Sequence, residues 1–201
     1  MIDLIETPAP VILPDSRSVA AHVERSTGAH LSDIIEDLFR SSAGLAHPSV
    51  VEREEQLASA QDIFEVGFLF EEAMRARDMA AYPGRYINIG EVECDGIIGT
   101  LDVLDLNFCG TGNRAVPDYK TTRINIDNIT ESVSWAKWWL RIQGYCYMTK
   151  SRIGVVRGLF LRGNYREIMS AQRSWYQVYS VATLQQSWGL IRSHAKRMGV
   201  I

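Results

Sequence analysis

The sequence has few cysteines and no long apolar run. Cys94, Cys109 and Cys146 are its only cysteines in 201 residues, and three scattered thiols make neither a disulfide framework nor a zinc knuckle. No apolar stretch reaches the length of a membrane span. The first six residues lack the basic region and long apolar stretch of a signal peptide. We therefore expect a reducing, cytoplasmic location and no membrane partner.

The sequence also lacks a G-x-x-x-x-G-K-[ST] loop, which excludes a P-loop ATPase motor in this chain. It shows no internal repeat and no low-complexity tract. A chain of this length can bury a full hydrophobic core as one unit. We predict a single domain over residues 1–201.

Charge is divided unequally along the chain. Residues 1–113 hold 7 Lys+Arg against 20 Asp+Glu, a balance of −13, and residues 114–201 hold 14 against 4, a balance of +10, which together give the net charge of −3. A nucleic-acid enzyme needs one basic face rather than a basic average. The second part of the chain is where we expect that face, although such asymmetry does not always form a patch.

The N-terminal quarter reads as an arm followed by a helical part. Three prolines predict that residues 1–15 form an extended arm. Residues 16–60 form the N-terminal helical part, in which apolar spacing from Leu31 to Phe39 predicts a helix. Ser26 and Thr27 are its expected caps.

The rest of the chain reads as alternating helices and strands, which predicts an α/β fold. The expected helices are 61–81, 132–149 and 183–198, and the expected strands are 87–94, 97–107, 114–121, 152–162 and 175–181. Asp95-Gly96 is a strong two-residue hairpin signal between the first two strands. Over residues 61–162 the order is helix, three strands, helix, strand.

An acidic residue, any residue and a lysine occur together at Asp118-Tyr119-Lys120. Strand side chains alternate, so Asp118 and Lys120 share a face. Asp102 lies on an otherwise apolar strand face, where a carboxylate is costly unless it is paired or binds metal. Two carboxylates and the Tyr119 carbonyl suit a hard divalent cation. With an ammonium beside them, they suit phosphodiester cleavage.

These segments resemble the PD-(D/E)XK nuclease superfamily, specifically its RecB-like branch of DNA exonucleases, over residues 26–162. Asp102 matches the first acidic position, and Asp118 and Lys120 match the second acidic position and the lysine. Gln143 and Tyr147 match the Gln-x-x-x-Tyr helix that follows the lysine strand. Each motif is short, and their order and spacing carry the resemblance.

The resemblance implies a restriction-endonuclease-like core, αβββαβ, with an N-terminal helix and a C-terminal strand and helix added. Residues 61–162 are then the catalytic core, and residues 163–201 are the C-terminal addition. It also implies a Mg²⁺- or Mn²⁺-dependent DNA nuclease, either an exonuclease or an end-processing enzyme of recombination, repair or replication. The alternatives are an endonuclease of restriction or repair type and a non-catalytic DNA-binding module.

Free-standing members of this branch are frequent in bacteriophages, which implies a phage origin and the host cytoplasm. A helicase, a recombinase or a single-strand-binding protein is the further partner to expect. Several members hold an iron–sulfur cluster on four cysteines, and three scattered cysteines exclude that cluster here. Oligomeric state stays open.

Further candidates come from the resemblance and from charge. His30 matches a histidine that serves as an additional metal ligand, although a histidine near a helix start is more often a cap or a core residue. Gln143 and Tyr147 are expected to position DNA, and the alternative is a packing stripe with Trp139. The expected DNA contacts of the basic half are Arg152, Arg157 and Arg162. Ranked lower are Glu71, Glu72, Glu91 and Glu93, whereas Asp105 falls on the opposite strand face from Asp102.

Overall fold

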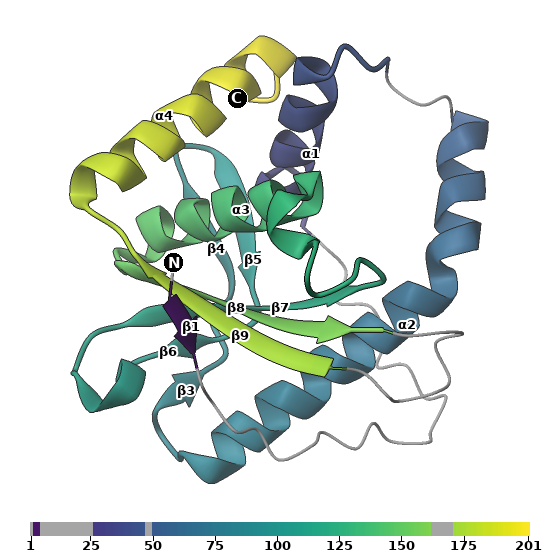
Figure 1. Cartoon of the computed structure of the whole chain (residues 1–201). Coiled ribbons are helices and arrows are strands. Elements are labelled where there is room, and N and C mark those ends of the chain that lie inside the picture. Colours follow the sequence, from purple (N-terminus) through teal and green to yellow (C-terminus); the bar gives the residue numbers. More distant parts are fainter. Residues whose placement is uncertain (1, 5–25, 47–49, 162–170) are drawn as a thin grey trace.

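The computed structural model describes residues 2–4, 26–46, 50–161 and 171–201 (Figure 1). For residues 2–4, 50–54, 56–65 and 171 the backbone alone is described. Arg162 and most of the expected N-terminal arm lie outside the described residues.

A six-stranded mixed sheet forms the centre of the molecule, in the order β1-β9-β8-β7-β6-β3. Its strands are β1 (Ile2–Leu4), β3 (Tyr86–Ile87), β6 (Leu104–Asp105), β7 (Ala115–Thr122), β8 (Ile153–Phe160) and β9 (Ala171–Val178). The central pair β7–β8 is parallel and its neighbours are antiparallel. A second, three-stranded sheet has the order β2-β5-β4, from β2 (Ala29–His30), β5 (Ile97–Leu101) and β4 (Gly90–Cys94).

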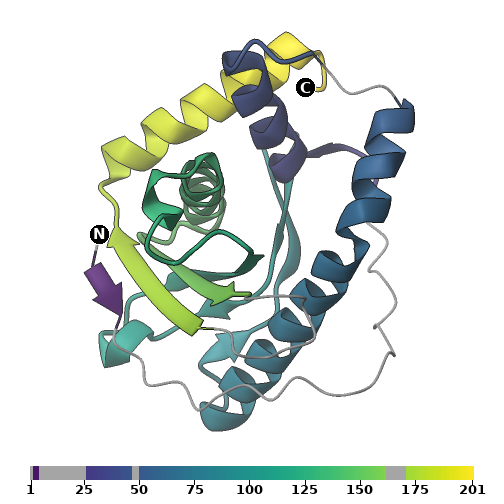
Figure 2. The same ribbon diagram turned by 45° about the vertical axis from the view of Figure 1, so that its right-hand side comes forward.

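Helices cover both faces of the large sheet. They are α1 (Leu31–Ser42), α2 (Val50–Ala81), α3 (Val133–Thr149) and α4 (Val181–Met198), with 3₁₀ turns at Phe108–Gly110 and Ile129–Glu131. One face packs against α3, with α1 and α4 behind it, and the other packs against α2 (Figures 1 and 2). No helix in the described parts of the chain combines the length and the apolar character that a membrane crossing needs.

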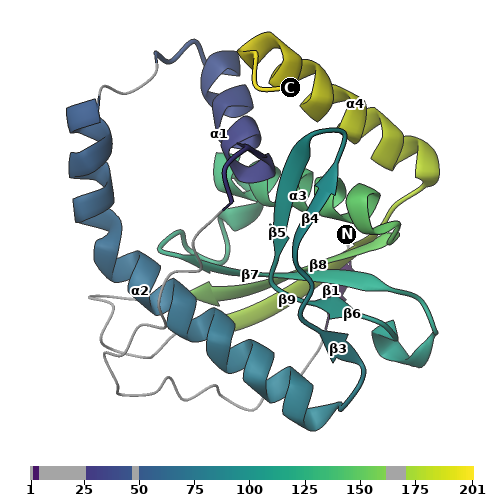
Figure 3. The same ribbon diagram turned by 180° about the vertical axis from the view of Figure 1, so that it is seen from behind.

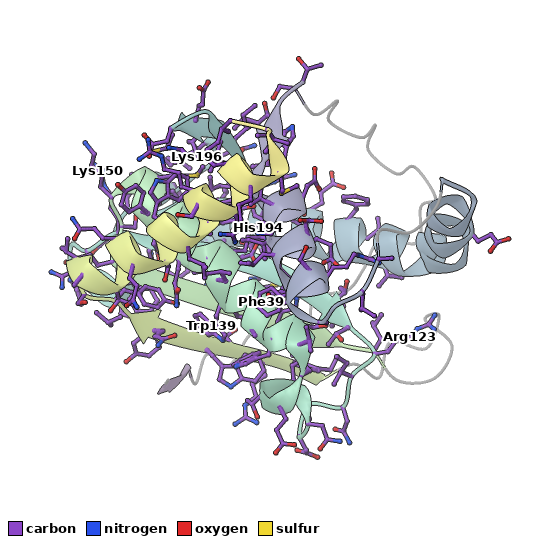
Figure 4. All side chains as sticks on the ribbon, turned by 90° about the horizontal axis from the view of Figure 1, so that it is seen from above. Phe39, Arg123, Trp139, Lys150, His194 and Lys196 are labelled. Carbon is purple, nitrogen blue, oxygen red and sulfur yellow. The ribbon has the colours of Figure 1, made fainter. Side chains whose placement is uncertain are left out.

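A buried polar contact joins α4 to α1, and a more exposed ion pair joins α3 to α1. His194 of α4 lies against α1 (Figure 4), and its Nε2 is 2.7 Å from Asp37 Oδ2. Lys137 of α3 pairs with Glu36 of α1 at 2.7 Å. These contacts, together with the apolar side chains between the helices, fix α1 and α4 over α3.

The expected hairpin is confirmed. Asp95 and Gly96 both have positive φ, 53° and 77°, as a two-residue turn of this kind requires. The turn joins β4 to β5, with Cys94 opposite Ile97. The expected order of helix, strands, helix and strand is observed, but five strands, β3 to β7, lie between α2 and α3 where three were expected. Ser132 caps α3 by accepting a hydrogen bond from the Trp135 N–H at 3.1 Å.

Several boundaries differ from those expected. The helix predicted from residue 61 begins at Val50, and α1 is preceded by His30 rather than by Ser26 or Thr27 as its cap residue. His30 makes no side-chain capping bond. The strand predicted over 97–107 breaks at Asp102 and Val103, so β5 belongs to the small sheet and β6 to the large one. Figure 3 shows the β4–β5 hairpin standing away from β7 and β8.

The break at Asp102 leaves part of β7 without a strand neighbour. Within the described residues, β6 pairs with β7 at Ala115 alone. Pro117, two positions later, has no N–H to donate on that side, which suits a strand whose partner has ended. On its other side β7 pairs with β8 along its full length. The central strand therefore has an open edge from Pro117 onward.

Candidate active site

Asp118 and Lys120 lie on this open part of β7. The Asp118 side chain is almost fully buried, and the Lys120 side chain is 13% exposed. Lys120 Nζ is 2.6 Å from Asp118 Oδ2 and donates a hydrogen bond to the Tyr119 carbonyl at 3.1 Å. The ammonium therefore contacts two of the oxygens that the sequence assigns to a metal ion.

Asp102 reaches the same place from the break between the two sheets. Its Oδ2 accepts a hydrogen bond from the Tyr119 N–H at 2.8 Å. Alternate N–H groups of a strand point to the same side, so the Tyr119 N–H points to the side on which β6 pairs with β7 earlier in the strand. The Asp102 carboxylate thus accepts the hydrogen bond that a neighbouring strand would otherwise accept. This contact brings Asp102 next to Asp118 and Lys120, as the sequence predicted.

Glu71 is a third carboxylate at this site, although the sequence ranked it lower. It lies on α2 one turn after Gly67, where a Cβ would come within 3.0 Å of Thr121 Oγ1. The helix therefore approaches β7 closely at this point. Asp118 and Lys120 both act on the pKa of Glu71. One feature of the sequence could have pointed to Glu71: it directly follows Phe70, which belongs to the buried apolar stripe of α2.

The electrostatics of the site are those of crowded negative charge. Burial raises the pKa of Asp102 well above its usual value, and the nearby Asp118 and Glu71 raise it further. Lys120 and the Tyr119 N–H oppose that rise. Burial likewise raises the pKa of Glu71, against the opposing charges of Arg75 and Lys120. A cation at this position would lower the energy of all three ionised carboxylates.

The donor set fits a hard divalent cation. Three carboxylates and the Tyr119 carbonyl supply oxygen ligands, which Mg²⁺ and Mn²⁺ prefer. In the described parts of the chain, however, no group of three or more His, Cys, Asp or Glu side chains is already arranged around one point. Lys120 and the Tyr119 N–H occupy carboxylate oxygens that a cation would use. In this arrangement Lys120 itself occupies positions that a cation would need.

His30 is not among the groups that act on the pKa of Asp102 or of Glu71. Its ring is 6% exposed, and Nε2 is 2.7 Å from the Ser26 carbonyl. A carbonyl can only accept, so Nε2 donates this hydrogen bond, and in the neutral ring Nδ1 then carries the lone pair. Nδ1 is buried, and none of the described residues forms a hydrogen bond with it. That is the tautomer a metal-binding histidine adopts when its other nitrogen is held by a backbone carbonyl.

Gln143 and Tyr147 face α4, which differs from the expectation that they position DNA at the site. Gln143 Oε1 accepts a hydrogen bond from Ser187 Oγ at 2.5 Å, and the Tyr147 ring stacks on Trp188 at 4.9 Å. Trp139 is buried against Trp135, as the packing alternative held. The described contacts of this motif join α3 to α4.

The predicted DNA contact at Arg157 is wrong for this structure. Its side chain is 4% exposed and forms an ion pair with Asp78 on the α2 side of the sheet. Arg152 is exposed, and its Nε donates to the Tyr179 carbonyl at 3.0 Å. Gly158 is the strand partner of Lys120. Arg152 lies six residues before Gly158, which corresponds to roughly 20 Å along the strand from the site. Arg157 was assigned by the positive charge of the second half of the chain, and charge alone does not tell whether a strand residue faces solvent or a buried counter-ion.

The remaining acidic candidates have other partners. Asp105 is 1% exposed and forms a two-point ion pair with Arg85 at 2.8 and 2.7 Å. Glu91 is exposed and accepts a hydrogen bond from the Ser26 N–H at 3.3 Å, and Glu93 is exposed.

Comparison with known proteins finds solved structures of similar fold but no match by sequence. No protein-family model matches the chain, and no curated protein matches it. A phage-related exonuclease from Haemophilus somnus 129PT superposes with a TM-score of 0.53 at 11% identity, over 86% of this chain and 93% of that one. An alkaline exonuclease from Laribacter hongkongensis gives 0.48 at 11% identity, over 86% and 88%. The structure of that exonuclease with dAMP gives 0.49 at 10% identity over the same shares.

The superposition on the phage-related exonuclease covers most of both chains, so the similarity extends over the whole fold. The chain has a mixed α/β, restriction-endonuclease-like fold, as the sequence predicted. At 11% identity the similarity shows the fold, and the chemistry has to be argued from the residues of this chain.

Proposed function

We propose that this chain is a Mg²⁺- or Mn²⁺-dependent DNA nuclease that hydrolyses phosphodiester bonds, as an exonuclease or an end-processing enzyme. The observation that carries the proposal is the gathering of Glu71, Asp102 and Asp118 around Lys120 at the open edge of β7. The Asp118 side chain is buried, and Asp102 and Glu71 are half-buried. Carboxylates withdrawn from water are costly without compensation, and these three lie near one ammonium. Such an arrangement favours binding of a divalent cation over any role in stability.

Each residue has a distinct role in this proposal. Asp102, Asp118 and the Tyr119 carbonyl hold the cation, with Glu71 as a further carboxylate ligand. When bound, the cation supplies Lewis-acid polarisation of a phosphoryl oxygen. Lys120 keeps a positive charge beside the scissile phosphate, where it orients the attacking water or neutralises charge that develops in the transition state. Low exposure of Asp118 and Lys120 strengthens these interactions.

Lys120 must exchange partners during loading of the site. In the arrangement described, its ammonium contacts Asp118 Oδ2 and the Tyr119 carbonyl. If those two oxygens held a cation, Lys120 Nζ would be free to turn toward a phosphate. Lysine has a flexible four-carbon stem, so this exchange needs a change of rotamer and no change in β7.

His30 is proposed as an additional nitrogen ligand. The support is the buried Nδ1 lone pair, which lacks a hydrogen-bond partner, and the Ser26 carbonyl, which fixes the proton on Nε2. Nitrogen ligands favour Mn²⁺ over Mg²⁺, so this ligand would make the site prefer Mn²⁺.

The exonuclease assignment is favoured over the endonuclease alternative by the fold shared with a protein described as a phage-related exonuclease. Digestion of linear and covalently closed circular DNA tests this assignment. We expect linear DNA to be degraded with Mg²⁺ or Mn²⁺ and closed circles to persist. Cutting of closed circles would make the chain an endonuclease. DNA binding without cleavage of either form, at any divalent metal concentration, would leave a binding module on a nuclease fold.

A further inference from the structure

The residue between Asp118 and Lys120 is connected to a buried ion network on the other side of the sheet. The Tyr119 ring faces α2, because strand side chains alternate. It is 5% exposed and meets the Phe70 ring edge-on, with centroids 6.2 Å apart. Its phenol donates a hydrogen bond to Asp78 Oδ2 at 3.2 Å.

Asp78 is the centre of that network. The side chain is 2% exposed, and Oδ2 also forms the ion pair with Arg157, the residue opposite Tyr119 on β8. Its other oxygen accepts from Arg77 at 2.8 and 3.1 Å. Arg157 in turn donates to the Tyr86 hydroxyl at 3.3 Å. A buried carboxylate with two guanidinium partners is held in one geometry, because loss of any partner leaves a charge uncompensated.

The backbone of the same tyrosine is part of the candidate active site. Its N–H donates to Asp102 and its carbonyl accepts from Lys120. Tyr119 is thus fixed on the α2 side by Asp78 and on the open edge by Asp102. With β6 ended and Pro117 unable to donate, no described strand pairs with that edge here. Besides the pairing of β7 with β8, these two side chains are what holds the Tyr119 backbone on the open edge.

We propose that Asp78, with Arg157 as its counter-ion, is a positioning residue that fixes the Tyr119 backbone and so sets the affinity of the site for a divalent cation. Asp78 touches no reacting group, and it acts through the phenol and the backbone of Tyr119. This inference rests on the proposed function for the identity of the metal site. It adds to that function a polar support behind the sheet that the acidic-x-lysine pattern does not include.

A network that served stability alone would behave differently, and two tyrosines separate the cases. Tyr119→Phe removes the hydrogen bond to Asp78 and keeps the ring packing on Phe70. Tyr86→Phe removes a hydroxyl from the same network, through Arg157, and lies on β3 rather than on β7. Both variants lose one buried phenol oxygen, so a purely structural role predicts similar losses in melting temperature and unchanged metal binding in both.

The measurement is the affinity for Mn²⁺, by calorimetry on the full chain without DNA, together with cleavage of linear DNA at limiting and saturating Mn²⁺. Tyr119→Phe should weaken Mn²⁺ binding by roughly tenfold, the effect typical of an outer-shell partner of a metal ligand. Cleavage should fall in proportion at limiting Mn²⁺ and recover at saturating Mn²⁺, with KM for DNA unchanged. Tyr86→Phe should bind Mn²⁺ within about twofold of the wild type.

Equal Mn²⁺ affinity in Tyr119→Phe and the wild type would overturn the positioning role. An equal loss in both variants would overturn it too, because the effect would then be general loosening of the network. A wild type that binds Mn²⁺ in a Tyr119-dependent way and cleaves no DNA would overturn the nuclease proposal and leave the positioning role standing. A wild type that binds no Mn²⁺ would overturn both.

Discussion

Replacement of Asp102 by asparagine should stabilise the metal-free protein while it weakens metal binding. Asparagine has the same shape, and its carbonyl oxygen can still accept the hydrogen bond from the Tyr119 N–H. The substitution removes the negative charge of the Asp102 carboxylate. Burial and the nearby charges of Asp118 and Glu71 raise the pKa of that carboxyl group. A raised folded-state pKa means that stability is lost as pH rises toward and through it, so ionisation of Asp102 destabilises the folded protein at alkaline pH. Asparagine cannot ionise and avoids that penalty.

The size of the effect follows from the linkage between pKa and stability. Each unit by which the pKa is raised corresponds to about 1.4 kcal/mol. For a chain of this length that is a gain of roughly 3–5 °C in Tm per unit. Thermal melts at pH 8 with a chelator should show the gain, and Mn²⁺ titrations should show an affinity loss of roughly tenfold or more.

Asp105→Asn is the matched control, three residues further along the chain. Asp105 is buried and paired with Arg85 at two points, so its charge stabilises the fold. Loss of one partner of a buried pair costs about 3–5 kcal/mol, or roughly 6–20 °C in Tm here. Mn²⁺ affinity should not change in this variant. If Asp102→Asn lost stability as Asp105→Asn does and kept its Mn²⁺ affinity, Asp102 would be a structural carboxylate and the site would have been misassigned.

Further predictions follow from the same geometry. Lys120→Ala should lower the cleavage rate by about 10²–10³-fold with Mn²⁺ affinity near normal, because the ammonium acts on the transition state; wild-type turnover would remove it from the mechanism. Mn²⁺ affinity should rise with pH until the raised pKa values of Asp102 and Glu71 are passed, and calorimetry in buffers of different ionisation enthalpy should detect proton release; a pH-independent affinity would contradict the carboxylate assignment. His30→Ala should weaken Mn²⁺ binding with little change in Tm, whereas a lower Tm with normal Mn²⁺ binding would make His30 a core residue. Arg157→Gln should lower Tm and leave the salt dependence of DNA binding unchanged, because the side chain is buried against Asp78; a shallower salt slope would return it to the DNA surface.

The pattern of spacing in the sequence was sufficient to predict β7 and the shared place of Asp118 and Lys120 on it. Asp118 and Lys120 share a face because strand side chains alternate, and the structure brings both next to Asp102. The hairpin at Asp95-Gly96 was equally predictable, because few other residue pairs adopt two positive φ angles in succession. Strand alternation and the Asp-Gly turn signal predicted the structure correctly because local backbone geometry determines both features.

The rest depended on tertiary packing. Glu71 was ranked lower because the close approach of α2 to β7 at Gly67, which the sequence does not show, is a contact between elements distant in the sequence. The break at Asp102 was hidden because Ile97 to Asn107 reads as one apolar strand, although its two halves belong to different sheets. Arg157 was assigned by charge, and its counter-ion Asp78 lies 79 residues away.

The position at which a divalent cation binds tests the proposed metal site most directly. Crystals of the wild type soaked with Mn²⁺, with diffraction recorded for anomalous differences, would locate it. We predict one strong peak in contact with Asp102, Asp118 and the Tyr119 carbonyl, with Lys120 Nζ moved off Asp118, and loss of that peak in Asp118→Asn. A Mn²⁺ peak elsewhere in the molecule, or wild-type crystals in which Lys120 still pairs with Asp118 at saturating Mn²⁺, would contradict the assignment of this site as a nuclease centre.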